Sequence, residues 1–198
     1  MRLSACILAG GRGTRLGGLA KGWLEVGGVP IVVRTRGLLE ALSDDVFVIA
    51  NDDRYDALGL RVVPDPAAFA GQGPLSGLLG ALEAAREPDL LLVACDLPAL
   101  SPALLALLAA APAADAVVPR AQGHAEPLVA RYSRTVASAI RERLGAGERK
   151  MTSFFPDVTV RWLEEAALRA ADPTLVSFEN VNAPEDLARL GANAGEGR

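Results

Sequence analysis

The chain has a glycine-rich loop with basic residues directly after its first apolar segment. Residues 3–8, LSACIL, end at Gly10-Gly11, and the glycine-rich segment that follows contains Arg15 and Lys21. Lys plus Arg number 20, but only two of them are lysines, so a lysine inside this loop is notable. Lysine is a compact point charge, and backbone N–H groups of such loops also bind anions. The segment therefore predicts a phosphate-binding loop that follows a buried strand.

Asp96 is the second residue whose position suggests chemistry. It follows the apolar run 90–95, LLLVAC, and Leu97-Pro98 turns the chain directly after it. A carboxylate at the mouth of a buried strand is costly unless a positive group pairs with it. Mg²⁺ usually takes one or two carboxylates plus phosphate oxygens. We therefore favour Asp96 as a ligand of the Mg²⁺ that accompanies a nucleoside triphosphate; the alternative is an aspartate that caps the next helix or forms a salt bridge.

Strand and helix patterns alternate along the chain and must position these residues. Apolar runs predict strands, and spacings of three and four residues, with Pro at first turns, predict helices. Such alternation indicates an α/β fold, with a mostly parallel central sheet and helices on both faces. The expected strands are 3–8, 46–50, 60–63, 90–95, 116–119, 127–130, 158–163 and 175–178, and the expected helices are 30–42, 74–86, 102–111, 134–144 and 184–190.

Polar residues stand where several of these strands end. Asn51 follows the second strand and Asp65 follows the third. Because ligands of open α/β sheets bind beyond the carboxyl ends of the strands, we expect both near the phosphate loop and Asp96. Each also has a structural interpretation, since Asn51 could cap a turn and Asp65, before Pro66, could close one.

Two familiar phosphate motifs do not fit the loop. A P-loop requires GxxxxGK[ST], but Lys21 follows Ala20 and precedes Gly22. The dinucleotide pattern GxGxxG could begin at Gly11, but Leu16 occupies its third glycine position. The pattern that remains is LAGGxxxRLGxxxK, with the lysine six residues after Arg15.

Composition excludes several classes of protein. With 198 residues and 51% hydrophobic residues, one domain at 1–190 is expected, followed by a polar, frayed tail at 191–198. A net charge of −4 gives no basis for binding nucleic acid or an acidic membrane surface. No apolar run reaches the ~20 residues of a membrane span, and no signal-peptide pattern opens the chain, so we expect a cytoplasmic protein. Cys6 and Cys95 lie in predicted strands and suggest buried thiols rather than a metal site or a disulfide.

Six segments, in order, resemble the molybdenum cofactor guanylyltransferase (MobA) family. These nucleotidyltransferases have a Rossmann-like, three-layer GT-A type fold with a mostly parallel central sheet. One departure is Ala183, where the family usually has threonine. The segments are LAGGRGTRLGGLAKGWLEVGG at 8–28, Asp65 followed by GPLSGL at 73–78, CDLP at 95–98, EPLVARY at 126–132, GER at 147–149 and NVNAPEDL at 180–187.

The resemblance implies transfer of GMP from GTP to the terminal phosphate of the molybdenum-bound pterin, with release of pyrophosphate. It implies catalytic roles for Arg15, Lys21 and Asp96, with Mg²⁺ on Asp96. The residues expected to contact the guanine nucleotide are Leu8, Ala9, Gly10, Gly11, Lys21, Asn51, Asp65 and Asp96, and those in segments expected to hold the acceptor are Gly77, Glu126, Arg149, Lys150, Asn180 and Asn182. Which of Asn51 and Asp65 meets the base stays open, and Arg149-Lys150 could equally be a solvated pair.

Two other functions compete with this interpretation. One is a different nucleotidyltransferase, either a cytidylyltransferase acting on the same pterin or a sugar-1-phosphate enzyme. The Gly10-Gly11 pair favours guanylyl over cytidylyl transfer, and the short step from Arg15 to Lys21 disfavours the sugar enzymes. The other is a non-catalytic nucleotide-binding adaptor, which would not need Asp96 together with Lys21. Besides GTP and molybdopterin, expected partners are cofactor-delivery proteins or apo-molybdoenzymes.

Overall fold

The structure is a computed structural model that describes residues 2–9, 21–181 and 186. Its main sheet runs in the order β10-β7-β9-β6-β1-β4-β5, with β8 paired to β7. The pairs β1–β4, β1–β6, β4–β5 and β7–β10 are parallel, whereas β9 is antiparallel to β6 and β7. The strands are β1 (Leu3–Leu8), β4 (Asp45–Ile49), β5 (Arg61–Val63), β6 (Asp89–Ala94), β7 (Ala116–Ala121), β8 (His124–Ala125), β9 (Val129–Ser133) and β10 (Val160–Leu163).

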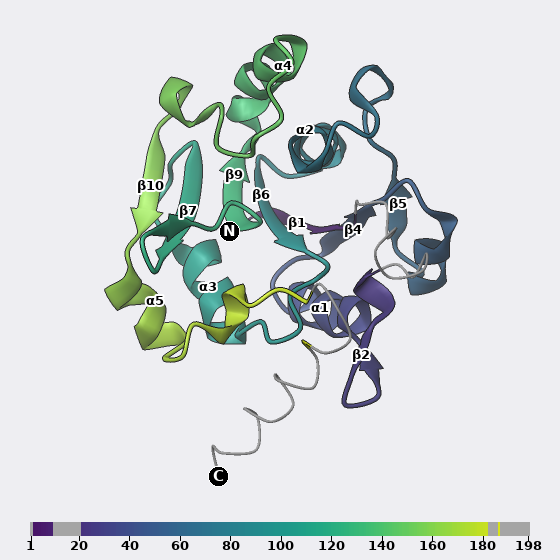
Figure 1. The fold of residues 1–198 in the computed structure, drawn as a ribbon, viewed down its shortest axis with the longest axis vertical. Coiled ribbons are helices and arrows are strands. Elements are labelled where there is room, and N and C mark those ends of the chain that lie inside the picture. The colour runs from purple at the N-terminus through teal and green to yellow at the C-terminus, as the bar shows by residue number, and fades with distance from the viewer. Residues whose placement is uncertain (1, 10–20, 182–185, 187–198) are drawn as a thin grey trace.

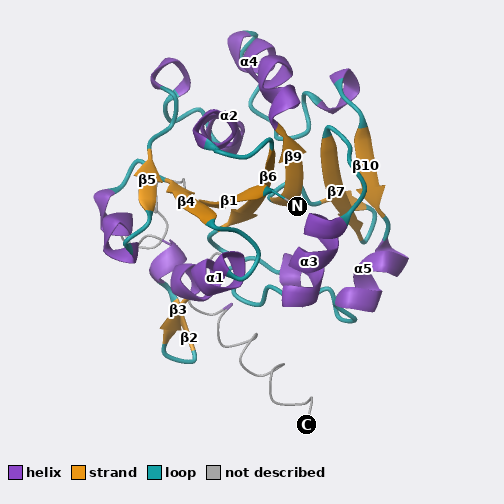
Figure 2. Ribbon diagram, turned by 180° about the vertical axis from the view of Figure 1, so that it is seen from behind, coloured by secondary structure: helices purple, strands orange, loops and turns teal. Residues whose placement is uncertain are grey.

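Helices cover both faces of this sheet and make three layers (Figure 1). On one face lie α2 (Pro74–Ala84) and α4 (Ala137–Gly145). On the other lie α1 (Ile31–Glu40), α3 (Pro102–Ala110) and α5 (Glu165–Ala171), as the view from behind also shows (Figure 2). Each interface between sheet and helices holds its own cluster of buried apolar side chains. The mostly parallel three-layer α/β fold predicted from the sequence is confirmed.

Local sequence explains the central elements. All six residues of β1 are buried, as a continuous apolar run at the centre of a covered sheet requires. Ser101 caps α3, because its side chain accepts a hydrogen bond from the backbone N–H of Leu104, and Pro102 starts the helix. A small hairpin of β2 (Glu25–Val26) and β3 (Val29–Pro30) precedes α1 and was not expected.

The expected strand at 175–178 is wrong, because this segment forms the 3-10 helix η7 (Val176–Phe178). Leu175 has a φ of 60°, and the backbone N–H of Ser177 donates to Asp172 Oδ2 at 2.9 Å, so the chain turns instead of extending. Helix α5 was also not expected. The expected helix at 184–190 lies, apart from Asp186, outside the described residues, as does the tail at 191–198.

Two buried charged groups join elements away from the site. Arg131 of β9 is 1% exposed, and its guanidinium donates to the carbonyl oxygens of Ala109, Ala111 and Pro112 at the carboxyl end of α3. Burial lowers the pKa of Arg131. The geometry shows why an arginine is tolerated inside: three carbonyls that the helix leaves without partners accept its hydrogen bonds.

Asp45, at the start of β4, connects the amino ends of the central strands. It accepts hydrogen bonds from Ser4 Oγ at 2.6 Å, from the backbone N–H of Arg86 at 3.0 Å and from Arg61 at 3.2 Å. Burial acts to raise the pKa of Asp45, but the hydrogen bonds from Ser4 and Arg86 and the charges of Arg61 and Arg86 outweigh it and lower the pKa.

Among the described residues, no helix has the length and apolar character needed to cross a membrane.

Candidate active site

The candidate site residues lie at the carboxyl ends of β1, β4, β5 and β6. Lys21 belongs to the short 3-10 helix η2 (Lys21–Trp23), which precedes the hairpin. Its Nζ lies 3.4 Å from Asp96 Oδ2, just beyond the end of β6, and the two side chains are 33% and 20% exposed. The fold thus pairs the loop lysine with the aspartate that follows the central strand, 75 residues later in the chain.

The backbone fixes the position of Asp96 on both sides. The N–H of Cys95 donates to the carbonyl oxygen of Leu8 at 3.1 Å, which extends the pairing of β6 with β1. The carbonyl oxygen of Asp96 accepts a hydrogen bond from the N–H of Val181 at 2.9 Å. The carboxylate of Asp96 therefore projects from a backbone held between the centre of the sheet and the C-terminal segment.

Asn51 and Asp65 form a second pair, at the ends of β4 and β5. Asn51 Nδ2 donates to Asp65 Oδ2 at 2.9 Å, and the backbone N–H of Asp65 donates back to Asn51 Oδ1 at 3.0 Å. Asp65 Oδ2 also accepts from the backbone N–H of Gly71 at 3.1 Å. These bonds fix the orientation of both side chains, so a ligand would meet a preorganised amide and carboxylate.

Leu8, Ala9 and Gly77 form the floor beside this pair. Ala9 continues β1 with a hydrogen bond from its N–H to the carbonyl oxygen of Ile49 at 2.9 Å, and both Leu8 and Ala9 are buried. A Cβ at Gly77 would lie 2.4 Å from Leu8 Cδ1 and 3.7 Å from Asp65 Oδ1. Gly77 therefore lets α2 approach β1, and it lies beside Asp65 rather than beside Asn180.

A small hollow of about 50 Å³, partly open to solvent, lies on the side of Asp96 that is opposite to Asn51 and Asp65. It brings Asp96 together with Glu126, which precedes β9, and Asn180, which follows η7. Burial raises the pKa of Glu126, and His124 nearby partly offsets the effect. The residues that line the hollow are Ala94, Asp96, Leu97, Glu126, Leu128, Val129, Phe178 and Asn180. Asp96 thus lies between the Asn51–Asp65 pair and this pocket.

The structure does not place every expected site residue. Gly10, Gly11, Arg15 and Asn182 lie outside the described residues. Arg149 and Lys150 are exposed, and neither lines the pocket.

Sequence analysis missed Tyr55, whose hydroxyl lies close to Gly22 and Cys95, the chain neighbours of Lys21 and Asp96. It belongs to the 3-10 helix η3 (Asp53–Leu58), and its ring stacks on that of Trp23 with centroids 6.0 Å apart. The one available signal was an aromatic residue shortly after a strand end.

The donor set suits a hard divalent cation that also binds phosphate. Among the described residues, no group of three or more His, Cys, Asp or Glu side chains could hold a metal by itself. Asp96 supplies a partly exposed carboxylate with Lys21 beside it. Mg²⁺ needs only one or two protein carboxylates when phosphate oxygens and water complete its shell, so the site fits a metal that arrives with a triphosphate.

Solved structures of similar fold are nucleotidyltransferases. The molybdopterin-guanine dinucleotide biosynthesis protein A of Archaeoglobus fulgidus has a TM-score of 0.78 and 24% identity, covering 98% of this chain and 99% of that one. The 2-C-methyl-D-erythritol 4-phosphate cytidylyltransferase of Thermus thermophilus has a TM-score of 0.69 and 19% identity, with coverage of 98% and 99%. The fold is that of the nucleotidyltransferases.

Sequence similarity narrows this class to one family. Residues 5–170 match the model of the MobA-like NTP transferase domain. The probable molybdenum cofactor guanylyltransferase of Pelotomaculum thermopropionicum is 39% identical over 96% of this chain and 92% of its own length. The molybdenum cofactor guanylyltransferase of Pseudomonas aeruginosa is 36% identical over 93% of this chain and 92% of its own length. The chain belongs to the MobA-like NTP transferase family and is a nucleotidyltransferase.

Proposed function

We propose that this enzyme transfers GMP from GTP to the terminal phosphate of the molybdenum-bound pterin cofactor and releases pyrophosphate. Membership of the family supports this reaction. The single observation that carries it is the 3.4 Å pair of Lys21 and Asp96 at the carboxyl end of the central strands. A non-catalytic adaptor would have no need for an ammonium group and a metal-binding carboxylate at the same point.

The chemistry requires charge control rather than a general base. An oxygen of the pterin phosphate attacks the α-phosphorus of GTP, a new P–O bond forms, and the bond to the β-phosphate breaks with pyrophosphate leaving. Because the attacking phosphate is already an anion, no proton has to be removed. The barrier lies in bringing two anions together in line, so catalysis rests on positioning and electrostatic stabilisation.

Lys21 and Asp96 divide this task. The Lys21 ammonium would contact the triphosphate directly and offset the charge of the departing pyrophosphate. Arg15, outside the described residues, is expected to add a second cation. Asp96 would hold Mg²⁺, which when bound supplies positive charge to the phosphate oxygens. Without ligands, the contact between Lys21 and Asp96 keeps the two groups close to where each is needed.

The two substrates would occupy opposite sides of Asp96. Leu8, Ala9 and the fixed pair of Asn51 and Asp65 would contact the guanine nucleotide, and Gly77 lets α2 pack close to β1 on that side. The pocket with Glu126 and Asn180 would receive the pterin, since Leu97, Leu128 and Phe178 offer apolar walls and the two polar groups offer hydrogen bonds. The terminal phosphate of the pterin would then reach the α-phosphate near Asp96.

A nucleotide panel tests the proposal. Calorimetry with Mg²⁺ should show binding of GTP in preference to CTP, ATP and UTP. Incubation with GTP and molybdopterin should then release one pyrophosphate for each guanine dinucleotide formed. Preference for CTP would replace the proposal with cytidylyl transfer to the same acceptor, and binding without pyrophosphate release would favour the adaptor.

The setting of the reaction follows from its substrates. Because GTP is the donor, we expect the enzyme to act in the cytoplasm. Its product would pass to cofactor-delivery proteins or to apo-molybdoenzymes.

A further inference from the structure

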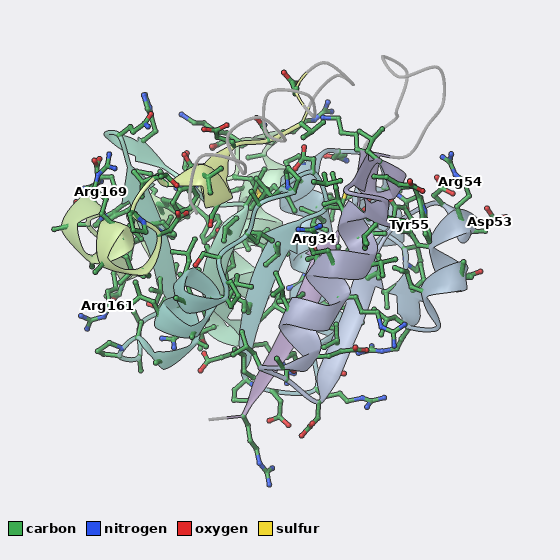
Figure 3. All side chains as sticks on the ribbon, turned by 90° about the horizontal axis from the view of Figure 1, so that it is seen from below. Arg34, Asp53, Arg54, Tyr55, Arg161 and Arg169 are labelled. Atoms are coloured by element: carbon green, nitrogen blue, oxygen red, sulfur yellow. The ribbon has the colours of Figure 1, made fainter. Side chains whose placement is uncertain are left out.

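Tyr55 is a buried tyrosine whose hydroxyl lies beside the chain neighbours of Lys21 and Asp96. The residue is 2% exposed and lies in η3, after β4. In Figure 3 Tyr55 lies beside α1, whereas Asp53 and Arg54 of the same segment lie at the outer edge of the molecule. A buried phenol normally needs a hydrogen-bond partner, so the surroundings of this hydroxyl indicate what it does.

The hydroxyl lies between Gly22 and Cys95. A Cβ at Gly22 would be 3.1 Å from Tyr55 Oη and 3.3 Å from Cys95 Cβ, so all three residues are in close contact. The Tyr55 hydroxyl interacts with the backbone N–H of Gly22 and with the Cys95 thiol. We call these two polar contacts the Tyr55 bridge.

The position of the bridge in the sequence gives it a functional meaning. Gly22 directly follows Lys21, and Cys95 directly precedes Asp96. One hydroxyl therefore connects the backbone that carries the ammonium to the strand end that carries the carboxylate. The distance between Lys21 Nζ and Asp96 Oδ2, 3.4 Å, depends on how these two backbones are held relative to each other.

The surroundings of the bridge restrict movement. The Trp23 ring stacks on Tyr55 at an interplanar angle of 28°, and Val32 of α1 would lie 3.2 Å from a Cβ at Gly22. Burial raises the pKa of Tyr55, so the phenol stays protonated.

We propose that Tyr55 is a positioning residue that sets the spacing of Lys21 and Asp96 for binding the metal and the triphosphate. The inference rests on the proposed function only in that these two residues bind the metal–nucleotide complex. If Tyr55 only filled space, its ring would suffice. If it positions the pair, its hydroxyl must matter separately from its ring.

The test compares two matched variants, because the chain has only two tyrosines and both are buried. Tyr55→Phe removes the bridge and keeps the ring. Tyr132→Phe removes the hydroxyl of the other buried tyrosine, which donates to the carbonyl oxygen of Pro127 at 2.7 Å, outside the Lys21–Asp96 contact. Thermal unfolding of both variants controls for loss of stability.

The decisive readout is the Mg²⁺ dependence of nucleotide binding and turnover. Loss of one neutral hydrogen bond corresponds to about a three- to tenfold change in an equilibrium. Tyr55→Phe should therefore raise the Mg²⁺ concentration for half-maximal nucleotide binding by about that factor and lower kcat. Tyr132→Phe should leave the Mg²⁺ dependence at the wild-type value. Wild-type Mg²⁺ dependence in Tyr55→Phe, or an equal shift in both variants, would overturn the inference.

A second variant tests the same contact from the other side. Gly22→Ala places a methyl group 3.1 Å from Tyr55 Oη and should displace Lys21, which would shift the Mg²⁺ dependence as well. In the double variant with Tyr55→Phe the contact with the oxygen is absent, whereas the contacts with Val32 Cβ at 3.2 Å and Cys95 Cβ at 3.3 Å remain, so the two effects should be less than additive. Full additivity would show that Gly22 and Tyr55 act independently and would contradict the bridge.

The outcomes separate this inference from the proposed function. The measurements use whichever nucleotide the panel selects. Selection of CTP would overturn guanylyl transfer, but a shifted Mg²⁺ dependence in Tyr55→Phe alone would still support the bridge. Selection of GTP with no effect of Tyr55→Phe would keep the proposed function and refute the bridge.

Discussion

Replacing Asp96 with alanine should separate catalysis from stability. In the folded protein without ligands, Asp96 contacts Lys21 at 3.4 Å, and both side chains are partly exposed. Such pairs contribute about 0–1 kcal/mol. For a chain of this length, 1 kcal/mol corresponds to about 2–4 °C in the unfolding midpoint, so Asp96→Ala should shift Tm by no more than that.

The expected effect on activity is far larger. Asp96 is the carboxylate next to the lysine at the carboxyl end of the central strands, where we place the metal and the triphosphate. Loss of one preorganised electrostatic group in an active site typically lowers kcat about 10²–10³-fold, which corresponds to about 3–4 kcal/mol. Pyrophosphate release from GTP in the presence of molybdopterin and Mg²⁺ should fall by at least this factor.

Asp115 provides the matched control. It lies at the opposite end of the sheet, where Oδ2 accepts from the backbone N–H of Thr159 and Oδ1 accepts from Thr135 Oγ1, each at 2.9 Å. Asp115→Ala should therefore lower stability by about 1 kcal/mol and leave pyrophosphate release unchanged. Asp96→Ala should show the opposite pattern. Full activity of Asp96→Ala would refute the assignment of metal binding. If Asp96→Ala instead lowers Tm so far that the protein is largely unfolded in the activity assay, the loss of activity would be due to unfolding.

Two further substitutions test the buried charges that hold the sheet together. Asp45→Asn should cost about 1–3 kcal/mol of unfolding free energy at pH 7 because it loses charge-assisted hydrogen bonds from Ser4 and Arg61. The pKa of Asp45 is lowered from 3.8, so its contribution is present above that pH and is lost as the pH falls through the folded-state pKa. Urea unfolding of wild type and Asp45→Asn should converge as the pH falls below about 4, and a constant difference down to pH 2 would contradict this. Arg131→Met should cost about 3 kcal/mol or more in urea unfolding, because buried carbonyls at the end of α3 lose their donors; a loss below about 1 kcal/mol would show that water replaces the guanidinium.

Some elements could be predicted from the sequence because their causes are local. The continuous apolar run of β1 predicts a short strand that is covered on both faces. Ser101-Pro102 starts α3 whatever the helix packs against. Other elements depended on distant residues. Nothing in the segment of β9, VARYS, gives its direction, and its antiparallel pairing with β6 follows from the fold. Segment 176–178 is apolar enough for a strand, but Asp172 holds it in a turn.

The candidate site shows the same division. The sequence by itself determined which groups are candidates for the chemistry: a lysine in a glycine-rich loop, an aspartate after a buried strand, and polar residues at two further strand ends. Their residue types and their places next to strand ends are local properties. Only the tertiary structure decided that Lys21 and Asp96 lie 3.4 Å apart, that Asn51 and Asp65 fix each other, and that Tyr55 lies beside Gly22, next to Lys21 in the chain. Contacts between residues far apart in the chain depend on how strands pair and helices pack, which no local pattern encodes.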